Sequence, residues 1–388
     1  MMKAGIALLA LSGMVVPQVA TAAPRPRPDR AVLQQDADQL LEMGAPGVLV
    51  ELTTPGGSAK VRSGYGDVEA RTPVPWDARF RIGSSTKTFT ATVVLQLVGE
   101  GRLSLEDTVD RWLPGVVTGN GNDGTRITVR QLLQHTSGVP DYLGSAAMAF
   151  LGSEEGFLAN RFRDFGEAEL VGMAMTLPPT FAPGADWSYS NTNYVLAGMI
   201  VKRVTGHDWA TEVRRRIIEP LHLDDTYAPT ALPLVLGPHA KGYTRFAPDG
   251  PAVDATAFSP SWAGAAGAVV SDTADLSTFL RALLGGRLLR PAQLAEMQKT
   301  VAAPEFQRAW PGARYGLGLA WIPTTCGGYW SHGGDVPGFR TRNGVTADGR
   351  TSVVISMNAD PIVPLEGTPP PRHDESVELI EHAFCGTP

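Results

Sequence analysis

The sequence has few of the features that mark metal-binding, nucleotide-binding and nucleic-acid-binding proteins. It contains only two cysteines in 388 residues, and no Cys/His cluster has the spacing of a zinc site. No glycine-rich phosphate-binding loop follows a predicted strand. The net charge is −6 and no block of basic residues occurs, which argues against binding to nucleic acid or to an anionic membrane surface. We therefore expect no cofactor and no metal.

Long hydrophobic runs are also missing, except at the N-terminus. There, Lys3 precedes an apolar stretch at residues 6–16, and small residues follow at 20–23. This order is typical of a secretory signal peptide, and the apolar stretch is short for a membrane span. We predict a signal peptide over residues 1–23 and a secreted, extracellular protein without membrane attachment after cleavage. An N-terminal membrane anchor is the alternative.

The two cysteines predict a single disulfide bond. Cys326 and Cys385 are the only two, and in an exported protein a lone pair of cysteines indicates a disulfide. Such a bond would tie the last residues to the body of the protein. Two free buried thiols are the alternative.

The composition, 43% hydrophobic and 19% charged, is that of a folded protein with a large core, and the length suggests two lobes. We predict an α+β fold in which residues 24–103 and 299–388 form an α/β lobe and residues 104–298 a mostly helical lobe. Turns are predicted at residues 55–57 and 64–66. Strands are predicted at residues 47–53, 59–64, 67–70, 316–322, 328–332, 338–345 and 352–357. Helices are predicted at residues 30–43, 88–99, 128–133, 167–175, 192–205, 210–218, 273–284 and 375–384.

The strongest chemical signal is the Ser-x-x-Lys spacing of Ser84 and Lys87, which occurs once in the chain. The residues that follow have helical periodicity, so the two side chains should lie on one helix face within hydrogen-bonding reach. A serine is a weak nucleophile unless a base accepts its proton, and an enclosed lysine can have its pKa lowered enough to do so. Alone, the pair is as well explained by a coincidence on the surface.

Two further motifs accompany this pair. Tyr189 and Asn191 form the only Tyr-x-Asn in the chain, just before a predicted helix. A tyrosine there can relay a proton, and the Asn amide can orient the lysine and bind a substrate amide, although a helix-capping loop also explains these residues. His332, in His-Gly-Gly, is the only His-x-Gly and by itself is equally typical of a turn.

Together and in this order, the three motifs resemble those of the class C β-lactamase and D-alanyl-D-alanine carboxypeptidase superfamily of serine hydrolases. The resemblance covers residues from about 30 to 388 and is most evident at residues 80–105, 127–142, 183–226, 315–319 and 385–388, which are similar to soluble, exported D-alanyl-D-alanine carboxypeptidases/transpeptidases. It implies an antiparallel sheet flanked by helices, an all-α lobe, and an active site between them.

The resemblance also implies roles for individual residues. Ser84 would be the nucleophile, with Lys87 as its base partner. Tyr189 would share in proton transfer and Asn191 would position Lys87 and the substrate. The histidine of the third motif would occupy the place of a lysine in other relatives. The remaining roles are an oxyanion hole formed by the backbone N–H groups of Ser84 and Asp335, and substrate-binding residues Trp262, Gly333, Gly334, Asp335 and Arg340. A core tryptophan is an equally good interpretation of Trp262.

The chain departs from the carboxypeptidase pattern where the family binds the terminal carboxylate of its substrate. Gly333 and Asp335 replace two threonines, and Ala320 replaces an arginine. Arg340 and Arg342, which lie on one face of a predicted strand, are positioned to compensate or to neutralise Asp335. We therefore expect free D-Ala-D-Ala termini to be poor substrates.

The predicted function is an exported serine hydrolase acting on D-amino-acid-containing peptides, amides or esters, or on β-lactams. An esterase, a β-lactamase or a peptide-cyclising acyltransferase would use the same machinery. A catalytically idle penicillin-binding or sensing protein is the alternative outside the enzymes. The sequence does not determine the oligomeric state.

Overall fold

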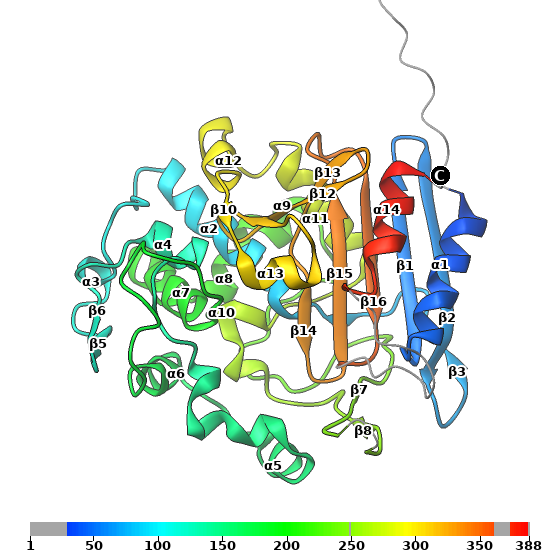
Figure 1. The fold of residues 1–388 in the computed structure, drawn as a ribbon, viewed down its shortest axis with the longest axis horizontal. Coiled ribbons are helices and arrows are strands. Elements are labelled where there is room, and N and C mark those ends of the chain that lie inside the picture. The colour runs from blue at the N-terminus through cyan, green and yellow to red at the C-terminus, as the bar shows by residue number, and fades with distance from the viewer. Residues whose placement is uncertain (1–28, 248–249, 361–372, 387–388) are drawn as a thin grey trace, which may run out of the picture.

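The computed structural model describes residues 29–247, 250–360 and 373–386, so the predicted signal peptide at residues 1–23 lies outside the described residues. The largest element is an antiparallel sheet in the order β10-β11-β12-β13-β15-β16-β1-β2-β3, with β14 paired to β15 at the edge (Figure 1). Its strands are β1 (Gly47–Thr54), β2 (Gly57–Asp67), β3 (Thr72–Pro73), β10 (Val301–Ala302), β11 (Arg314–Tyr315), β12 (Ala320–Thr324), β13 (Gly327–Ser331), β14 (Gly334–Val336), β15 (Phe339–Val345) and β16 (Ser352–Met357).

The helices come from the two ends of the chain and from its middle part. They are α1 (Arg30–Glu42), α2 (Thr86–Gly99), α3 (Val109–Trp112), α4 (Val129–Gln134), α5 (Glu154–Asn160), α6 (Glu167–Ala174), α7 (Thr192–Thr205), α8 (Trp209–Val213), α9 (Glu219–Leu221), α10 (Gly264–Gly267), α11 (Thr273–Leu284), α12 (Pro291–Met297), α13 (Pro304–Ala309) and α14 (Val377–Cys385). Short two-stranded pairs join β4 (Phe80–Arg81) to β9 (Val270–Ser271), β5 (Thr118–Gly119) to β6 (Asn122–Asp123), and β7 (Tyr243–Thr244) to β8 (Val253–Asp254).

The centre of the sheet is covered on both faces. Strand β1 pairs with β16 on one side and β2 on the other, and Val50 lies opposite both Ile355 and Val61. Helices α1 and α14 pack on one face, and α11 packs on the other against β1, β15 and β16 (Figure 1). Strand β1 is buried along almost its whole length, and its buried Glu51 accepts a 2.7 Å hydrogen bond from Thr273 of α11.

Between β4 and β10 the chain is mostly helical, while the sheet takes its strands from either side of this segment. The mixed α+β class and the antiparallel sheet are therefore as predicted; the division of the chain into two lobes stays a prediction. Within the described ranges, no helix combines the length and the apolar character that crossing a membrane requires.

Three predicted elements have the observed bounds, most of the others differ by one to three residues at an end, and three differ more. Helices α7 and α11 and strand β16 begin and end where predicted. The turn predicted at residues 64–66 is wrong, because β2 continues through it. The strand predicted at residues 67–70 is wrong, because the Asp67 side chain accepts the N–H groups of Glu69 and Ala70 and closes a turn. The strand predicted to begin at residue 316 begins at Ala320.

Candidate active site

Ser84 lies in a short 3-10 turn, η1 (Gly83–Ser85), that leads directly into helix α2. Helix α2 is buried on all sides from Thr86 to Leu95, so the packing around it fixes the position of the turn. The edge strand β14 lies against η1. A Cβ atom added to Gly83 would lie 2.8 Å from the backbone nitrogen of Asp335, and one added to Gly334 would lie 1.9 Å from the oxygen of Ile82. Because only glycines permit this approach, the backbones of Ser84 and Asp335 come side by side.

Lys87 is fully buried one helical turn after Ser84. Its Nζ lies 2.9 Å from Ser84 Oγ, 2.7 Å from Asn191 Oδ1 and 2.8 Å from the carbonyl oxygen of Ala266. All three partners are neutral. Burial lowers the pKa of Lys87 to about 7, although the negative charge of Asp141 nearby opposes the shift. A substantial fraction of Lys87 is therefore an unprotonated amine at neutral pH.

Tyr189 lies beside Lys87, with its ring centroid 4.8 Å from Nζ. Burial is the main reason that the pKa of the Tyr189 phenol lies well above its usual value, and the nearby Ser84 side chain opposes this only partly. Tyr189 is therefore a neutral phenol that can donate and accept a proton, while Lys87 is the group that titrates near neutrality.

Asn191 is oriented by a residue that the sequence analysis missed. Asp141 Oδ2 accepts the side-chain Nδ2–H of Asn191 at 2.8 Å and its backbone N–H at 3.0 Å. Since a carboxylate accepts hydrogen bonds, Nδ2 must face Asp141 and Oδ1 must face Lys87. Asp141 lies 50 positions earlier in the chain, and the only sequence signal for it was its place within the family-like stretch at residues 127–142.

His332 is buried near this group, but neither of its ring nitrogens is bonded to it. Nδ1 lies 2.7 Å from the carbonyl oxygen of Gly333, and Nε2 lies 2.8 Å from the hydroxyl of Tyr315. A carbonyl only accepts, so Nδ1 carries the proton and Nε2 accepts from Tyr315. Burial lowers the pKa of His332 to about 3, so the ring is neutral. Both ring nitrogens of His332 are thus engaged by Gly333 and Tyr315, and its catalytic role stays a prediction.

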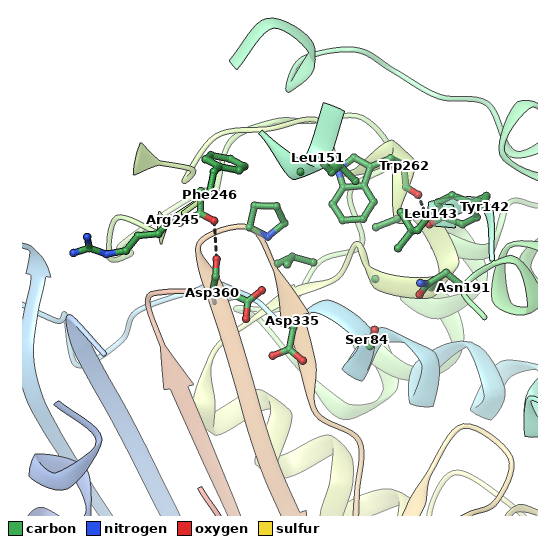
Figure 2. Close-up of a pocket in the computed structure, with 17 residues that line it drawn as sticks. Ser84, Tyr142, Leu143, Leu151, Asn191, Arg245, Phe246, Trp262, Asp335 and Asp360 are labelled. Carbon is green, nitrogen blue, oxygen red and sulfur yellow. Dashed lines mark hydrogen bonds between the residues drawn. The ribbon is translucent and has the colours of Figure 1, made fainter. Parts of the chain in front are cut away.

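A cavity of about 340 Å³ opens beside Ser84 (Figure 2). One wall is apolar and includes Leu143, Leu151 and Trp262, and the Trp262 backbone is fixed by a 2.5 Å hydrogen bond from the hydroxyl of Tyr142. Trp262 is buried in the core and also lines the cavity, and its contact with substrate stays a prediction.

The opposite wall of the cavity carries two carboxylates, Asp335 and Asp360 (Figure 2). The Asp335 side chain is 44% exposed, whereas that of Asp360 is 20% exposed. Gly333 and Gly334, which the resemblance placed among the substrate-binding residues, do not line this cavity.

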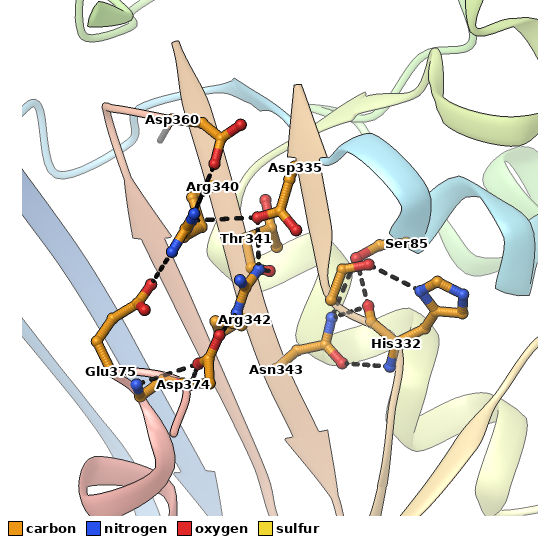
Figure 3. A network of polar contacts seen from close by, with 12 residues as sticks. Ser85, His332, Asp335, Arg340, Thr341, Arg342, Asn343, Asp360, Asp374 and Glu375 are labelled. Carbon is orange, nitrogen blue, oxygen red and sulfur yellow. Dashed lines mark hydrogen bonds and ion pairs between the residues drawn. The ribbon is translucent and has the colours of Figure 1, made fainter. Parts of the chain in front are cut away.

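Arg342 holds Asp335 from behind the cavity wall (Figure 3). Its Nη1 lies 2.8 Å from Asp335 Oδ1, and its Nε lies 2.7 Å from Asp374 Oδ2. Arg342 and Asp374 are almost completely buried, with 5% and 3% of their side chains exposed. Burial alone would raise the pKa of Asp335, but Arg342 and Arg340 more than offset this, and the pKa is lowered. Asp335 is therefore ionised at neutral pH.

Arg340 gives all three of its nitrogens to carboxylates. Nε and Nη2 bind Asp360 at 3.0 and 2.8 Å, and Nη1 binds Glu375 at 2.6 Å; Nε also lies 3.2 Å from Asp335. Arg340 does not line the cavity, and none of its guanidinium nitrogens is left without a carboxylate partner. The predicted contact between Arg340 and the substrate is therefore not available in this arrangement. Burial, with the charge of Asp335, raises the pKa of Asp360 to about 7.

The part of the chain that the structure describes contains no group of three His, Cys, Asp or Glu side chains that could hold a metal ion. Cys326 and Cys385 are joined in a disulfide between the β12–β13 turn and the end of α14, the helix that packs beside α1.

Comparisons with known proteins agree with this geometry. A family model described as Beta-lactamase matches residues 30–375. A crystal structure of a D-stereospecific amidohydrolase from Streptomyces sp. has a TM-score of 0.84 and 42% identity, covering 93% of this chain and 100% of that chain. A D-amino acid amidase from Ochrobactrum anthropi SV3, complexed with D-phenylalanine, has a TM-score of 0.78 and 28% identity, covering 91% and 97%. Penicillin-binding protein 4* of Bacillus subtilis is 29% identical over 344 residues, which are 84% of this chain and 69% of that protein.

Proposed function

The chain belongs to the β-lactamase family of serine hydrolases, and from this premise we propose that it hydrolyses D-aminoacyl amides, peptides or esters through an acyl-enzyme on Ser84. The observation that carries the proposal is the 2.9 Å hydrogen bond between Ser84 Oγ and Lys87 Nζ beside a cavity, with the Tyr189 ring 4.8 Å from the same Nζ. The names of the amidohydrolase and the amidase support the choice of substrate class.

In the proposed acylation step, Ser84 Oγ attacks the substrate carbonyl carbon while its proton passes to Lys87. A lysine with a pKa near 7 is suited to this task, because it is unprotonated near neutral pH and still basic. Tyr189, as a neutral phenol, donates to the departing nitrogen or oxygen and recovers a proton from Lys87. Water then attacks the acyl-enzyme by the reverse route and releases the acid.

The negative oxygen of the tetrahedral intermediate needs hydrogen-bond donors at a fixed place. We assign this role to the backbone N–H groups of Ser84 and Asp335, because the close packing of Gly83 and Gly334 brings η1 and β14 together. In serine hydrolases, the loss of one such donor costs about 3–4 kcal/mol of transition-state stabilisation. Any residue other than glycine at position 334 would separate the two donors.

The charge around the cavity favours substrates without a free carboxylate beside the scissile bond. Arg340 and Arg342 supply two positive charges, whereas Asp335, Asp374 and Glu375 supply three negative ones, and Asp360, with a pKa of about 7, adds part of a fourth. A terminal carboxylate of a D-Ala-D-Ala peptide would approach this anionic wall without an unoccupied arginine to receive it. We therefore propose an amidase- or esterase-like specificity rather than carboxypeptidase activity, with an apolar acyl group against Leu143, Leu151 and Trp262.

The first test is covalent labelling of the purified protein with a fluorophosphonate, followed by intact-mass spectrometry. We expect one adduct on the wild type and none on Ser84→Ala. A second measurement compares hydrolysis of D-phenylalanine amide, a D-aminoacyl ester, a D-Ala-D-Ala peptide and a cephalosporin. Labelling that survives in Ser84→Ala would contradict the assignment of the nucleophile. Labelling of the wild type without turnover of any substrate would favour an idle penicillin-binding protein.

Export of the protein is part of the proposal and is supported by the charged, apolar and small-residue order at residues 1–23. The same mass spectrum tests it when the producing cells and their culture medium are analysed separately, and we expect the protein in the medium. The expected mass lacks the signal peptide and two hydrogen atoms, because Cys326 and Cys385 are joined. A full-length mass would contradict export.

A further inference from the structure

His135 is a buried residue beside the candidate active site to which the proposed mechanism gives no role. It follows α4 directly and is fully buried. Its φ of +62° lies in the left-handed region, which is costly for a residue with a Cβ atom. Such a conformation persists only where the surrounding contacts hold it, and it is common at functional sites.

The contacts of His135 converge on the segment around Tyr189. The carbonyl oxygen of His135 accepts the backbone N–H of Ser188 at 3.1 Å, and its Nδ1 accepts that of Ser190 at 3.2 Å. Between these two bonds, the imidazole ring lies against the phenol ring of Tyr189, with centroids 4.4 Å apart and planes 32° apart. One residue therefore holds Tyr189 by the backbone on both sides and by the face of its ring.

The hydrogen bonds also fix the tautomer of His135. A backbone N–H only donates, so Nδ1 is an acceptor, and the proton lies on Nε2. A second donor confirms this: Ser137 Oγ donates to Asn193 Oδ1 at 2.6 Å, which turns the Asn193 amide nitrogen towards Nδ1 at 3.1 Å. Burial is the main reason that the pKa of His135 lies well below its usual value. The ring therefore stays neutral and keeps its acceptor.

Tyr189 depends on this support because its own segment has no regular structure. Residues 186–190 form neither helix nor strand and lead into α7. The phenol ring also packs on Phe306, with centroids 5.8 Å apart. A displaced phenol would no longer meet Ser84 Oγ, and a shift of about 1 Å in a reacting group can cost about 100-fold in rate.

We propose that His135 is a positioning residue that sets the place of the Tyr189 hydroxyl over Ser84. The inference rests on the proposed function, in which Tyr189 takes part in acylation. His135 does not touch the substrate and transfers no proton.

The experiment is a double-mutant cycle read by the rate of fluorophosphonate labelling of Ser84. His135→Asn tolerates the left-handed backbone and keeps an acceptor for Ser190, whereas His135→Phe keeps a ring and removes the acceptor. We expect labelling to slow about 10- to 100-fold in each variant of the wild type. In the Tyr189→Phe background we expect the same changes to slow it by less than about threefold, because a residue that acts through Tyr189 has nothing further to lose.

Two controls separate positioning from general damage. Leu170→Ala removes a buried side chain of α6 outside the cavity; it should lower the melting temperature and leave the labelling rate of the folded protein unchanged. The rise of the labelling rate near pH 7 should stay in place in the His135 variants, because Lys87 keeps its surroundings.

Equal losses in the wild-type and Tyr189→Phe backgrounds, or no loss in either variant of the wild type, would overturn the proposal. Failure of the proposed function would look different. In that case the wild type would not be labelled at Ser84, or Tyr189→Phe alone would leave the labelling rate unchanged.

Discussion

Lys87 and Arg342 are both buried cations close to the cavity, and their surroundings are opposite. Lys87 has three neutral oxygens as partners, and its pKa falls to about 7. Arg342 lies between the carboxylates of Asp335 and Asp374, and its pKa is raised well above the usual value. Burial disfavours the charged form in both cases, so the neighbouring anions decide the outcome. The first arrangement yields a base, and the second a permanently charged brace between β14, β15 and the C-terminal segment.

The largest effect should follow from removing one anion of the brace. Asp374→Asn leaves Arg342 buried with Asp335 as its only carboxylate, and breaking a buried ion pair from one side costs about 3–5 kcal/mol of unfolding free energy. Urea denaturation measures this loss. The exposed Asp77→Asn serves as the control and should change stability by less than about 0.5 kcal/mol. An equally small loss in Asp374→Asn would show that the brace does not stabilise the fold.

The next effect follows from giving Lys87 an anion. The double variant Asn191→Asp with Asp141→Asn exchanges the two side chains and places a carboxylate 2.7 Å from Nζ. An adjacent opposite charge raises the pKa of a cation by about 1–3 units. Lys87 would then remain protonated at pH 7, so acylation should slow about 10- to 1,000-fold there and recover as the pH passes the new pKa.

The pH dependence of fluorophosphonate labelling measures this shift. In the wild type the rate should rise through about pH 7, because the amine must lose its proton to act as a base. Asp141→Asn alone removes the distant anion without adding one beside Nζ, and it should not move the rise upward. An unchanged pH profile in the double variant would mean that another group is the base.

The smallest effect concerns specificity. Asp335→Thr removes the exposed carboxylate from the cavity wall and releases Arg342 towards it. Repulsion between unit charges 4 Å apart is about 1 kcal/mol in water and about 4 kcal/mol at a dielectric of 20. Because Arg340 and Arg342 partly neutralise Asp335, we expect its repulsion of a substrate carboxylate to be near the lower value. We expect kcat/KM for a D-Ala-D-Ala peptide to rise roughly fivefold to tenfold relative to its amide.

The matched control is Glu375→Gln, which changes the charge of the same network by one unit away from the cavity. It should leave that ratio unchanged. An arginine at position 320 is not a suitable addition, because Ala320 is buried beside Trp187 and Tyr315 and has no room for a guanidinium group. If the wild-type protein already hydrolyses the D-Ala-D-Ala peptide faster than its amide, Asp335 does not repel the substrate carboxylate and this explanation of specificity is wrong.

The sequence predicted those features whose determinants are local. The spacing of Ser84 and Lys87 on one turn of helix was enough to bring Oγ and Nζ together, at 2.9 Å. The 3.6-residue period of α7 and α11 and the apolar run of β16 fixed their bounds, because each of these elements buries a continuous face or strand.

The features that it missed depend on partners far along the chain. The sequence pattern predicts a turn at Gly64, but this glycine lies within β2 and packs against the backbone of Pro46. A Cβ atom at position 64 would lie only 2.3 Å from the carbonyl oxygen of Pro46. Gly318 was assigned to a strand, but it packs on Ala91 of helix α2 with a φ of +74°. The orientation of His332 towards Tyr315 likewise depends on tertiary contacts that no local pattern encodes.

The pairing of β1 with β16 has a consequence for how the protein assembles. This ladder joins residues about 300 positions apart, so its closure carries a large loop-entropy cost that local helix formation does not. During synthesis, β1 and β2 emerge early with an unpaired edge, and an unpaired edge favours pairing with other chains. The sheet can be completed only when residues 352–357 have been made. The first long strand to be synthesised thus forms its stable pairing with the last, and folding of the sheet follows translation rather than accompanying it.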